Sequence, residues 1–137
     1  MFAVAAHFRA GGLHIRIDSA SPPRSALGGS SAAAVALVGA LARCRSLAGG
    51  SDLQRDQAAR MAQHIEETVA GVPCGIQDQL AAAHGGIRTW YWHVGPDGLA
   101  IRRDDSAGAA VAKAFPDHVL VAYGGIPHES PDVNGTW

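Results

Sequence analysis

The chain is predicted to adopt an α+β fold, with strands and helices that alternate along the sequence. Apolar and polar residues alternate over Gly12–Asp18, which is the period of a half-buried strand. The apolar stretch Ser30–Arg43 has the length of a helix. Two further segments, Ile87–Val94 and Leu99–Arg103, flank a Gly-Pro-Asp-Gly turn and predict a β-hairpin. With 47% hydrophobic residues among 137, we expect one globular unit with a modest core.

The first two helices are placed by their composition and their ends. Ser30–Arg43 carries small apolar residues on nearly all of its faces, so this helix is predicted to be central and to lie against a mixed sheet. Ser51, with Gln54 three residues later, has the spacing of a capping box. It opens a second helix that we expect to continue to Thr68.

The remaining elements are shorter. A helix over Gln77–His84 is predicted to end at the glycine pair that follows it. We expect the hairpin next, then a helix over Ser106–Phe115. A last strand over Val119–Tyr123 would join the hairpin and Gly12–Asp18 in the sheet.

The loop before the first long helix has the composition of an anion-binding site. Pro22 and Pro23 make the chain enter the loop extended. Gly28 and Gly29 then permit a tight turn into the helix that Ser30 opens. Such a loop presents unpaired N–H groups and the positive end of the helix dipole together, and this combination binds phosphate. The same residues would also suit an ordinary loop and cap before a buried helix.

A second segment, downstream of the loop, supplies a carboxylate. Phosphoryl transfer to an alcohol requires an in-line hydroxyl, a carboxylate that takes or orients its proton, and cations over the phosphates. Asp78, in the sequence Gly-Ile-Gln-Asp-Gln, suits the second of these tasks. Alone, it would also suit the first turn of a helix, where the dipole favours a carboxylate. If the loop and Asp78 form one site, the carboxylate lies within roughly 10 Å of the helix N-terminus.

Three segments, in order, resemble those of one enzyme family. Residues 22–32, P-P-R-S-A-L-G-G-S-S-A, resemble the motif P-P-x-x-G-L-G-S-S-A of the GHMP kinases and are closest to its heptose-phosphate kinase branch. Residues 71–79, G-V-P-C-G-I-Q-D-Q, resemble the segment of galactokinases and heptose kinases that holds the catalytic aspartate. Leu120–Asn134 is similar to a strand and loop of sugar and heptose-phosphate kinases. The resemblance covers residues 10–134.

The resemblance implies a fold, two cofactors and a catalytic residue. The fold would be the ribosomal protein S5 domain 2-like arrangement of a GHMP kinase N-terminal domain. The cofactors would be ATP and Mg²⁺, and Asp78 would be the catalytic residue. The nucleotide would be bound by the loop residues Pro23, Ser25, Leu27, Gly28, Gly29, Ser30 and Ser31.

The same resemblance implies a metal site and a substrate site. The metal ligands would be Ser30 and Glu66, with the neighbouring Glu67 as the other option. Only one of two adjacent carboxylates on a helix can point at a given spot. The acceptor would be a sugar or a sugar phosphate such as a heptose phosphate. The residues that contact it would be Gly75, Gln77 and Gly125.

Relative to the family, the chain is predicted to hold a central portion only. Residues 1–137 would be a partial N-terminal domain, with the phosphate-binding loop at 22–33, the catalytic-aspartate segment at 71–86 and no C-terminal domain. The family's first nucleotide motif and its late G-x-G-x-G-G motif are not found in this sequence. We therefore expect the isolated chain to show no kinase activity. Three functions stay open: a small-molecule kinase or its core, a non-catalytic ligand-binding relative or inactive fragment, and a lyase like the diphosphomevalonate decarboxylases.

Charge and composition limit the partners. Eleven basic and twelve acidic residues give a net charge of −1, so no basic field would draw nucleic acid or an anionic membrane. The longest apolar stretch, Ala32–Ala42, is too short to span a bilayer. Two cysteines and seven scattered histidines form no zinc or disulfide pattern, and we expect a reducing cytoplasmic setting. The expected partners are ATP and the sugar substrate, and a homodimer is left open.

Overall fold

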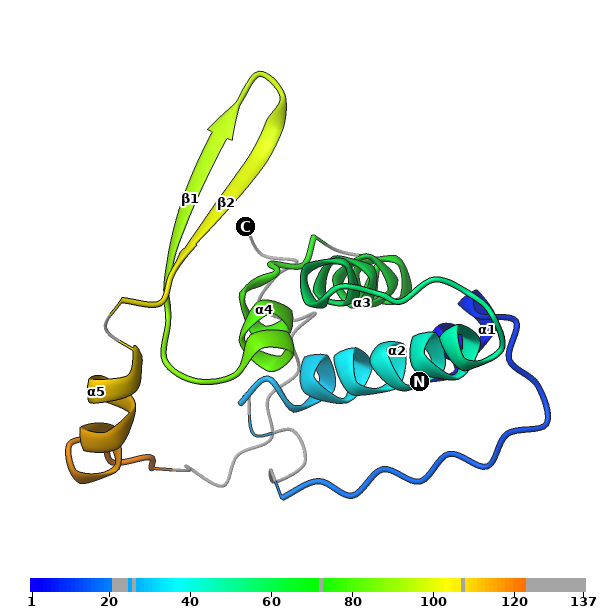
Figure 1. Cartoon of the computed structure of the whole chain (residues 1–137), viewed down its shortest axis with the longest axis horizontal. Coiled ribbons are helices and arrows are strands. Elements are labelled where there is room, and N and C mark those ends of the chain that lie inside the picture. The colour runs from blue at the N-terminus through cyan, green and yellow to red at the C-terminus, as the bar shows by residue number, and fades with distance from the viewer. Residues whose placement is uncertain (21–24, 26, 72, 107, 123–137) are drawn as a thin grey trace. The chain divides into compact units, whose positions relative to one another are not determined.

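Helices and a hairpin occupy different parts of the fold (Figure 1). The computed structural model describes residues 1–20, 25, 27–71, 73–106 and 108–122. Where we expected one globular unit, the contacts divide the described chain into Met1–His84 and Gly85–Tyr123. The first unit contains helices α1 to α4, and the second contains strands β1 and β2 and helix α5. Helices and an antiparallel sheet in separate stretches agree with the predicted α+β class.

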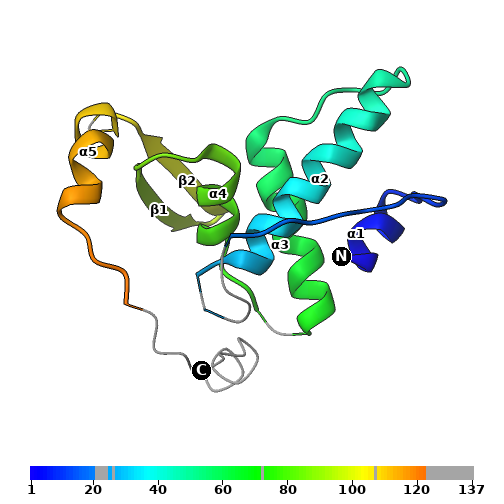
Figure 2. The ribbon, with the colours of Figure 1, turned by 90° about the horizontal axis from the view of Figure 1, so that it is seen from below.

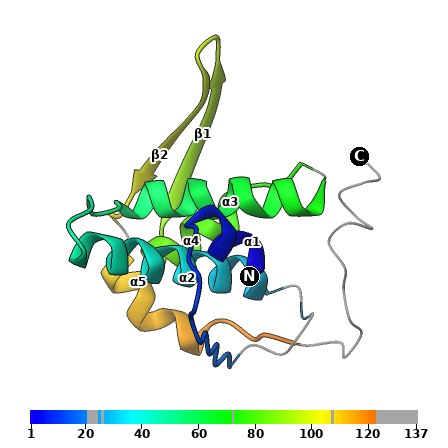
Figure 3. The ribbon, with the colours of Figure 1, turned by 90° about the vertical axis from the view of Figure 1, so that its right-hand side faces the viewer.

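The first unit is built around a helical hairpin. α2 (Gly29–Leu47) and α3 (Arg55–Ala70) run side by side in opposite directions, as Figures 2 and 3 show. α1 (Phe2–His7) packs against both of them, and so does α4 (Gln77–His84). The predicted helices over Ser30–Arg43 and Gln77–His84 are therefore confirmed, and α2, like α3, contacts every other helix of this unit.

The core of the first unit lies where α1, α2 and α3 meet. α2 buries one side only: Val38 is fully buried, whereas Ala36 and Ala40 are exposed. α3 contributes small residues, which allow the two long helices to approach closely. The buried apolar cluster consists of Val4, Ala34, Val35, Leu37, Val38, Leu41, Ala58, Ala62 and Ile65.

The start of α3 differs from the prediction. The helix begins at Arg55, so its N-cap is Gln54 and not Ser51. The Gln54 side chain accepts from the Gln57 backbone, and the Gln54 backbone N–H donates to Gln57 Oε1 at 2.9 Å. The capping-box spacing was correct but belongs to a glutamine pair one turn later, because two side-chain amides can make the same reciprocal bonds.

The second unit holds the predicted hairpin. β1 (Thr89–Gly95) pairs antiparallel with β2 (Gly98–Asp104), and the register runs from Thr89 opposite Asp104 to Gly95 opposite Gly98. Tyr91 lies opposite Arg102, whose guanidinium carbon is 4.1 Å from the centre of the tyrosine ring. The predicted helix follows as α5 (Gly108–Ala114), and a 3-10 turn over Phe115–Asp117 continues it.

The predicted mixed sheet is wrong for the described residues. Gly12–Asp18 and the described part of the last predicted strand, residues 119–122, form no strand, and the sheet has only β1 and β2. The apolar residues of the first segment, Leu13, Ile15 and Ile17, stay exposed. Alternation shows that a segment could bury one face, but a strand also requires a neighbour for its backbone hydrogen bonds. α2 consequently packs against helices and not against a sheet.

The helices of the described chain were also compared with the requirements of a membrane span. Among the residues that the structure describes, no helix combines the length and the apolar character that crossing a bilayer requires.

Candidate functional site

The N-terminus of α2 presents the backbone N–H groups of its first turn. Gly28 is the N-cap and adopts a left-handed conformation, with φ 68° and ψ 18°. Its carbonyl accepts from the Ala32 N–H at 2.9 Å, and among the described residues no side chain caps the helix and its first turn contains no acidic residue. The N–H groups of this turn and the positive end of the 19-residue helix therefore face outward together. This arrangement can bind an anion.

Asp78 lies directly against this N-terminus. It is in the first turn of α4, exposed to solvent. A Cβ built on Gly28 would stand 3.3 Å from Asp78 Cγ and 3.4 Å from Oδ2. Two segments 50 residues apart in sequence thus meet, and the predicted convergence of the glycine loop and Asp78 is confirmed. A carboxylate beside a phosphate-sized anion site can take or orient the proton of an attacking hydroxyl.

In the turn before α4, a glutamine side chain occupies the space beside a glycine. The Gln77 side chain folds back over Gly75, so that a Cβ on Gly75 would stand only 2.8 Å from Gln77 Cδ. With a larger residue at position 75, the exposed and flexible Gln77 side chain would have to turn away. Gly75 and Gln77, both expected to contact substrate, therefore lie against one another, one residue before Asp78.

A buried glutamine joins three helices at the same place. Gln79 is 0% exposed. Its Nε2 donates to Glu66 Oε2 on α3 at 2.6 Å and to Ser31 Oγ on α2 at 3.1 Å. The sequence left Glu66 and Glu67 as alternatives; in the structure Glu66 is held toward α2 and α4, while Glu67 accepts from Gln63 of its own helix at 3.0 Å.

Cys74 lies beside this network. Its Sγ is 3.9 Å from Gln79 Nε2, and its carbonyl accepts from Gln63 Nε2 at 2.9 Å. Burial, and then the negative charge of Glu66, raise the pKa of the Cys74 thiol. The Cys74 thiol therefore lies in a partly buried environment with carboxylates nearby.

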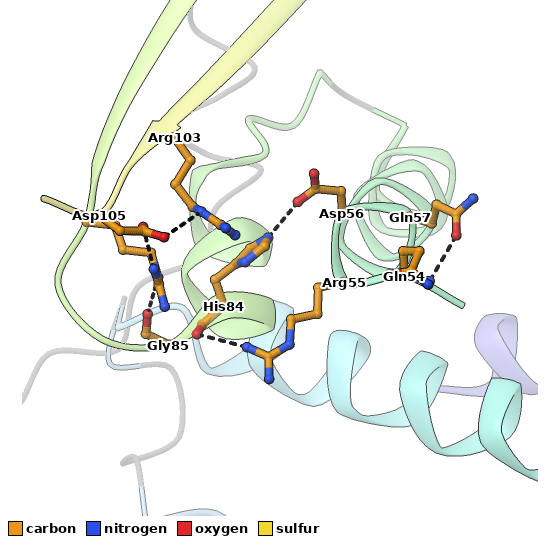
Figure 4. A network of polar contacts seen from close by, with 9 residues as sticks. Gln54, Arg55, Asp56, Gln57, His84, Gly85, Arg103 and Asp105 are labelled. Atoms are coloured by element: carbon orange, nitrogen blue, oxygen red, sulfur yellow. Dashed lines mark hydrogen bonds and ion pairs between the residues drawn. The ribbon is translucent and has the colours of Figure 1, made fainter. Parts of the chain in front are cut away.

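The position of α4 is fixed at its other end as well. The ring of His84, which is buried, pairs through Nε2 with Asp56 Oδ1 of α3 at 2.5 Å (Figure 4). The His84 carbonyl, at the end of α4, accepts from the Arg55 guanidinium at 3.3 Å. Contacts at both ends of an eight-residue helix hold it on α3, and they hold the Asp78 turn in place. In the second unit, the carboxylate of Asp105 pairs with Arg88 and Arg103 (Figure 4).

The predicted site residues divide into three groups. Gly28, Ser31, Glu66 and Asp78 are brought together around the N-termini of α2 and α4. Leu27, Gly29 and Ser30 are exposed at the same helix end, and Ser25 is half-buried in the loop before it. Pro23 and Gly125 lie outside the described residues.

Sequence reasoning gave no role to Gln79, Gln63 or Cys74. Gln79 is the last residue of Gly-Ile-Gln-Asp-Gln, so the motif contained it. Its burial and its partners come from two other helices, and no local pattern could have shown them.

A comparison with protein families supplies the decisive observation. The family model of the GHMP kinases N terminal domain matches residues 1–86. The chain belongs to the GHMP kinase superfamily. The match to this superfamily covers α1 to α4 and every described residue of the site above. No curated protein and no solved structure matches the chain.

Membership makes the chain a relative of ATP-dependent phosphotransferases. In such enzymes a helix N-terminus can bind phosphate, and a carboxylate beside it can orient the attacking hydroxyl. The match does not reach the segment Leu120–Asn134, so the third resemblance stays a prediction.

Proposed function

We propose that this chain is the catalytic core of an ATP-dependent kinase that phosphorylates a sugar or a sugar phosphate, such as a heptose phosphate. The observation that carries the proposal is the contact between Asp78 and Gly28, which puts a carboxylate at the anion-binding end of α2. A GHMP kinase family match over the same residues supports the reaction class. The Gly-Ile-Gln-Asp-Gln sequence favours a sugar kinase over an isoprenoid enzyme, and the ribosomal protein S5 domain 2-like fold is part of this proposal.

In the proposed reaction, the α2 N-terminus binds the ATP phosphates through its backbone N–H groups. Asp78 accepts or orients the proton of the acceptor hydroxyl, whose oxygen forms a new bond to the γ-phosphorus as the bond from that phosphorus to the ADP oxygen breaks. The acceptor would lie over the turn that Gly75 and Gln77 form next to Asp78. Positioning supplies most of the rate in such reactions, because little covalent chemistry is required of the protein.

The donor set fits Mg²⁺. Ser30 offers a hydroxyl and Glu66 a carboxylate, both hard oxygen ligands. Among the described residues no group of three or more His, Cys, Asp or Glu could hold a metal ion on its own. Mg²⁺ commonly binds through one or two protein oxygens together with substrate phosphates, and it neutralises phosphate charge when bound. We assign Ser30 and Glu66 to it, with the carboxylate of Glu67 turned to Gln63.

The test is an ATP-consumption assay of the natural protein that contains this chain, over a panel of sugars and sugar phosphates. Asp78→Asn is nearly isosteric and removes the charge, so turnover should fall by a factor of about 10² or more with ATP affinity little changed. Asp97→Asn removes the same charge from an exposed turn of the hairpin and should change neither.

Two results would contradict the proposal. Turnover that survives Asp78→Asn would remove this residue from the chemistry. ATP binding without turnover of any acceptor would favour the alternative, a non-catalytic ligand-binding relative. Ser30→Ala should weaken ATP binding only when Mg²⁺ is present, because Ser30 is exposed and its loss removes one oxygen ligand.

A further inference from the structure

Two neighbouring glutamates of α3 are each held by a glutamine. Gln63 donates to Glu67 within α3, at 3.0 Å. Gln79 donates to Glu66 from α4, at 2.6 Å. The chemistry of the two pairs is the same, but the directions differ, since adjacent residues on a helix project about 100° apart. Only the pair with Gln79 reaches the α2 N-terminus, because the same amide also donates to Ser31.

The bond from Gln79 to Glu66 is strong enough to fix a side chain. A neutral N–H that donates to a carboxylate forms a charge-assisted bond, and 2.6 Å is at the short end for such bonds. Without a partner, a glutamate side chain samples several rotamers, and ordering it on ligand binding has an entropic cost. Gln79 pre-orders Glu66 in the free protein.

Burial of Gln79 is not explained by stability. The side chain is 0% exposed, and its Oε1 accepts no hydrogen bond from the described residues. A buried amide carbonyl without a donor is destabilising relative to one that is paired. An apolar side chain of similar volume would avoid this cost. A polar group that is retained in spite of such a cost is typical of a functional site.

We propose that Gln79 is a positioning residue, which selects Glu66 over Glu67 as the carboxylate that faces a divalent cation at the α2 N-terminus. This inference rests on the proposed function. The Gln79 Nε2 group donates to one oxygen of the Glu66 carboxylate and also to the Ser31 hydroxyl, which lies in the first turn of α2. The distance between the cation ligand and the phosphate-binding turn is thereby set by one rigid amide, before nucleotide binds.

The experiment measures ATP binding to the full chain by calorimetry, once with Mg²⁺ and once with EDTA. The readout is the gain in affinity that Mg²⁺ gives. Gln79→Met keeps the volume and removes the donor, and it should reduce this gain about tenfold, as loss of an outer-shell partner does at metal sites. Affinity in EDTA should stay the same. Glu67→Gln is the matched control: it removes the charge of the other glutamate, leaves the bond from Gln63 to the Cys74 carbonyl in place, and should leave the gain unchanged.

A double mutant separates positioning from general stability. If Gln79 acts through Glu66, then Gln79→Met should add little to the loss caused by Glu66→Gln. Thermal unfolding checks that each variant is folded. If Gln79→Met does not fold, Gln79→Asn keeps the amide but withdraws the donor by about one carbon–carbon bond, and it should lose the Mg²⁺ gain in the same way.

The outcomes are distinguishable. If the wild-type chain binds Mg²⁺–ATP and folded Gln79 variants keep the full gain, Gln79 has no positioning role, whereas the proposed kinase function stands. If Glu67→Gln loses as much of the Mg²⁺ gain as Gln79→Met, selection of Glu66 is wrong. If the wild-type chain binds no ATP under either condition, the proposed function fails and the role of Gln79 fails with it.

Discussion

At the scale of single residues, Gly28 performs two tasks that only glycine can combine. Its φ of 68° is one that other residues adopt at a cost of about 1–2 kcal/mol. Its missing side chain also leaves the space that Asp78 occupies, at 3.3 Å from the position of a Cβ. The absence of a Cβ at residue 28 therefore permits both the left-handed turn of the loop and the position of the Asp78 carboxylate.

Gly28→Ala should therefore lower both stability and function. We expect a loss of about 1–2 kcal/mol in chemical denaturation, together with reduced turnover, because the Asp78 carboxylate must move. Gly71→Ala is the matched control: its φ is 69°, and nothing lies within 4 Å of the new Cβ. It should lose similar stability without a specific loss of turnover. Equal turnover in the two variants would show that the contact with Asp78 is unimportant.

Cys74 allows the charge near Gln79 to be probed. Because burial and Glu66 raise its pKa, less of the thiol is ionised at a given pH, and the thiolate is the form that reacts. At pH 8, alkylation by iodoacetamide should be slower at Cys74 than at the exposed Cys44, and the Cys74 rate should continue to rise at higher pH. Peptide mass spectrometry reports the two sites separately.

Removing the negative charge of Glu66 should bring the pKa of the Cys74 thiol part of the way back to its ordinary value. Glu66→Gln should lower the pKa of the Cys74 thiol and so increase its alkylation rate. Glu67→Gln should have a smaller effect, because the charge of Glu67 raises the pKa less than that of Glu66 does. An equal or larger effect of Glu67→Gln would contradict the orientation of the two glutamates.

At the scale of elements, α4 depends on α3 more than on its own sequence. An isolated helix of eight residues is unstable in water, so its contacts must hold it. Asp56 and Arg55 hold its last residue, and Glu66 holds Gln79 in its first turn. Local patterns identified α4 correctly from its apolar residues and the glycines after it, but not the partners that keep it folded.

Asp56→Ala should destabilise the first unit. The His84 side chain is only 5% exposed, and the variant removes the carboxylate that pairs with its ring. We expect a loss of about 1 kcal/mol in denaturant unfolding, at the lower end for a buried polar group because Asp56 itself is exposed. Asp52→Ala removes a charge from an exposed pair with Arg43, at 3.7 Å, and should change stability by less than about 0.5 kcal/mol. Equal losses of stability in the two variants would argue against a specific contact between Asp56 and His84.

The failures of prediction also belong to this scale. Helices make their hydrogen bonds within one segment, so the stretches that became α2, α3 and α4 could be recognised locally. Gly12–Asp18 and the last predicted strand needed partners from elsewhere, and their patterns contain no information about which partner is present. The site residues divide in the same way, into those that a local motif identifies and those that depend on contacts between elements. The motifs located Gly28 and Asp78. The contacts of Gln79, and the different directions of Glu66 and Glu67, depend on packing between helices.

At the scale of the whole molecule, the two units differ in how they are stabilised. The first has a buried apolar cluster from three helices. The second relies on a two-stranded hairpin whose strand residues are mostly exposed, among them Trp92, Val94 and Leu99. A two-stranded hairpin is only marginally stable in water.

Hydrogen exchange should separate the units. Amides of α2 and α3 that pack in the core, such as those of Val38 and Ala62, should exchange at least about 100-fold more slowly than the paired amides of β1 and β2. Exchange measured by mass spectrometry or nuclear magnetic resonance gives both rates in one sample. Similar protection in the hairpin and in the helices would mean that the hairpin is stabilised as strongly as the helical core.

The packing of Gln77 on Gly75 has a consequence for how this segment can evolve. A side chain at position 75 would meet the far end of the Gln77 side chain, which is exposed and flexible and can turn away. The two positions are therefore coupled in variation: a change at the first requires a new rotamer at the second, whereas a shorter residue at position 77 removes the contact altogether. A substitution at position 75 thus also changes which way the neighbour of Asp78 projects.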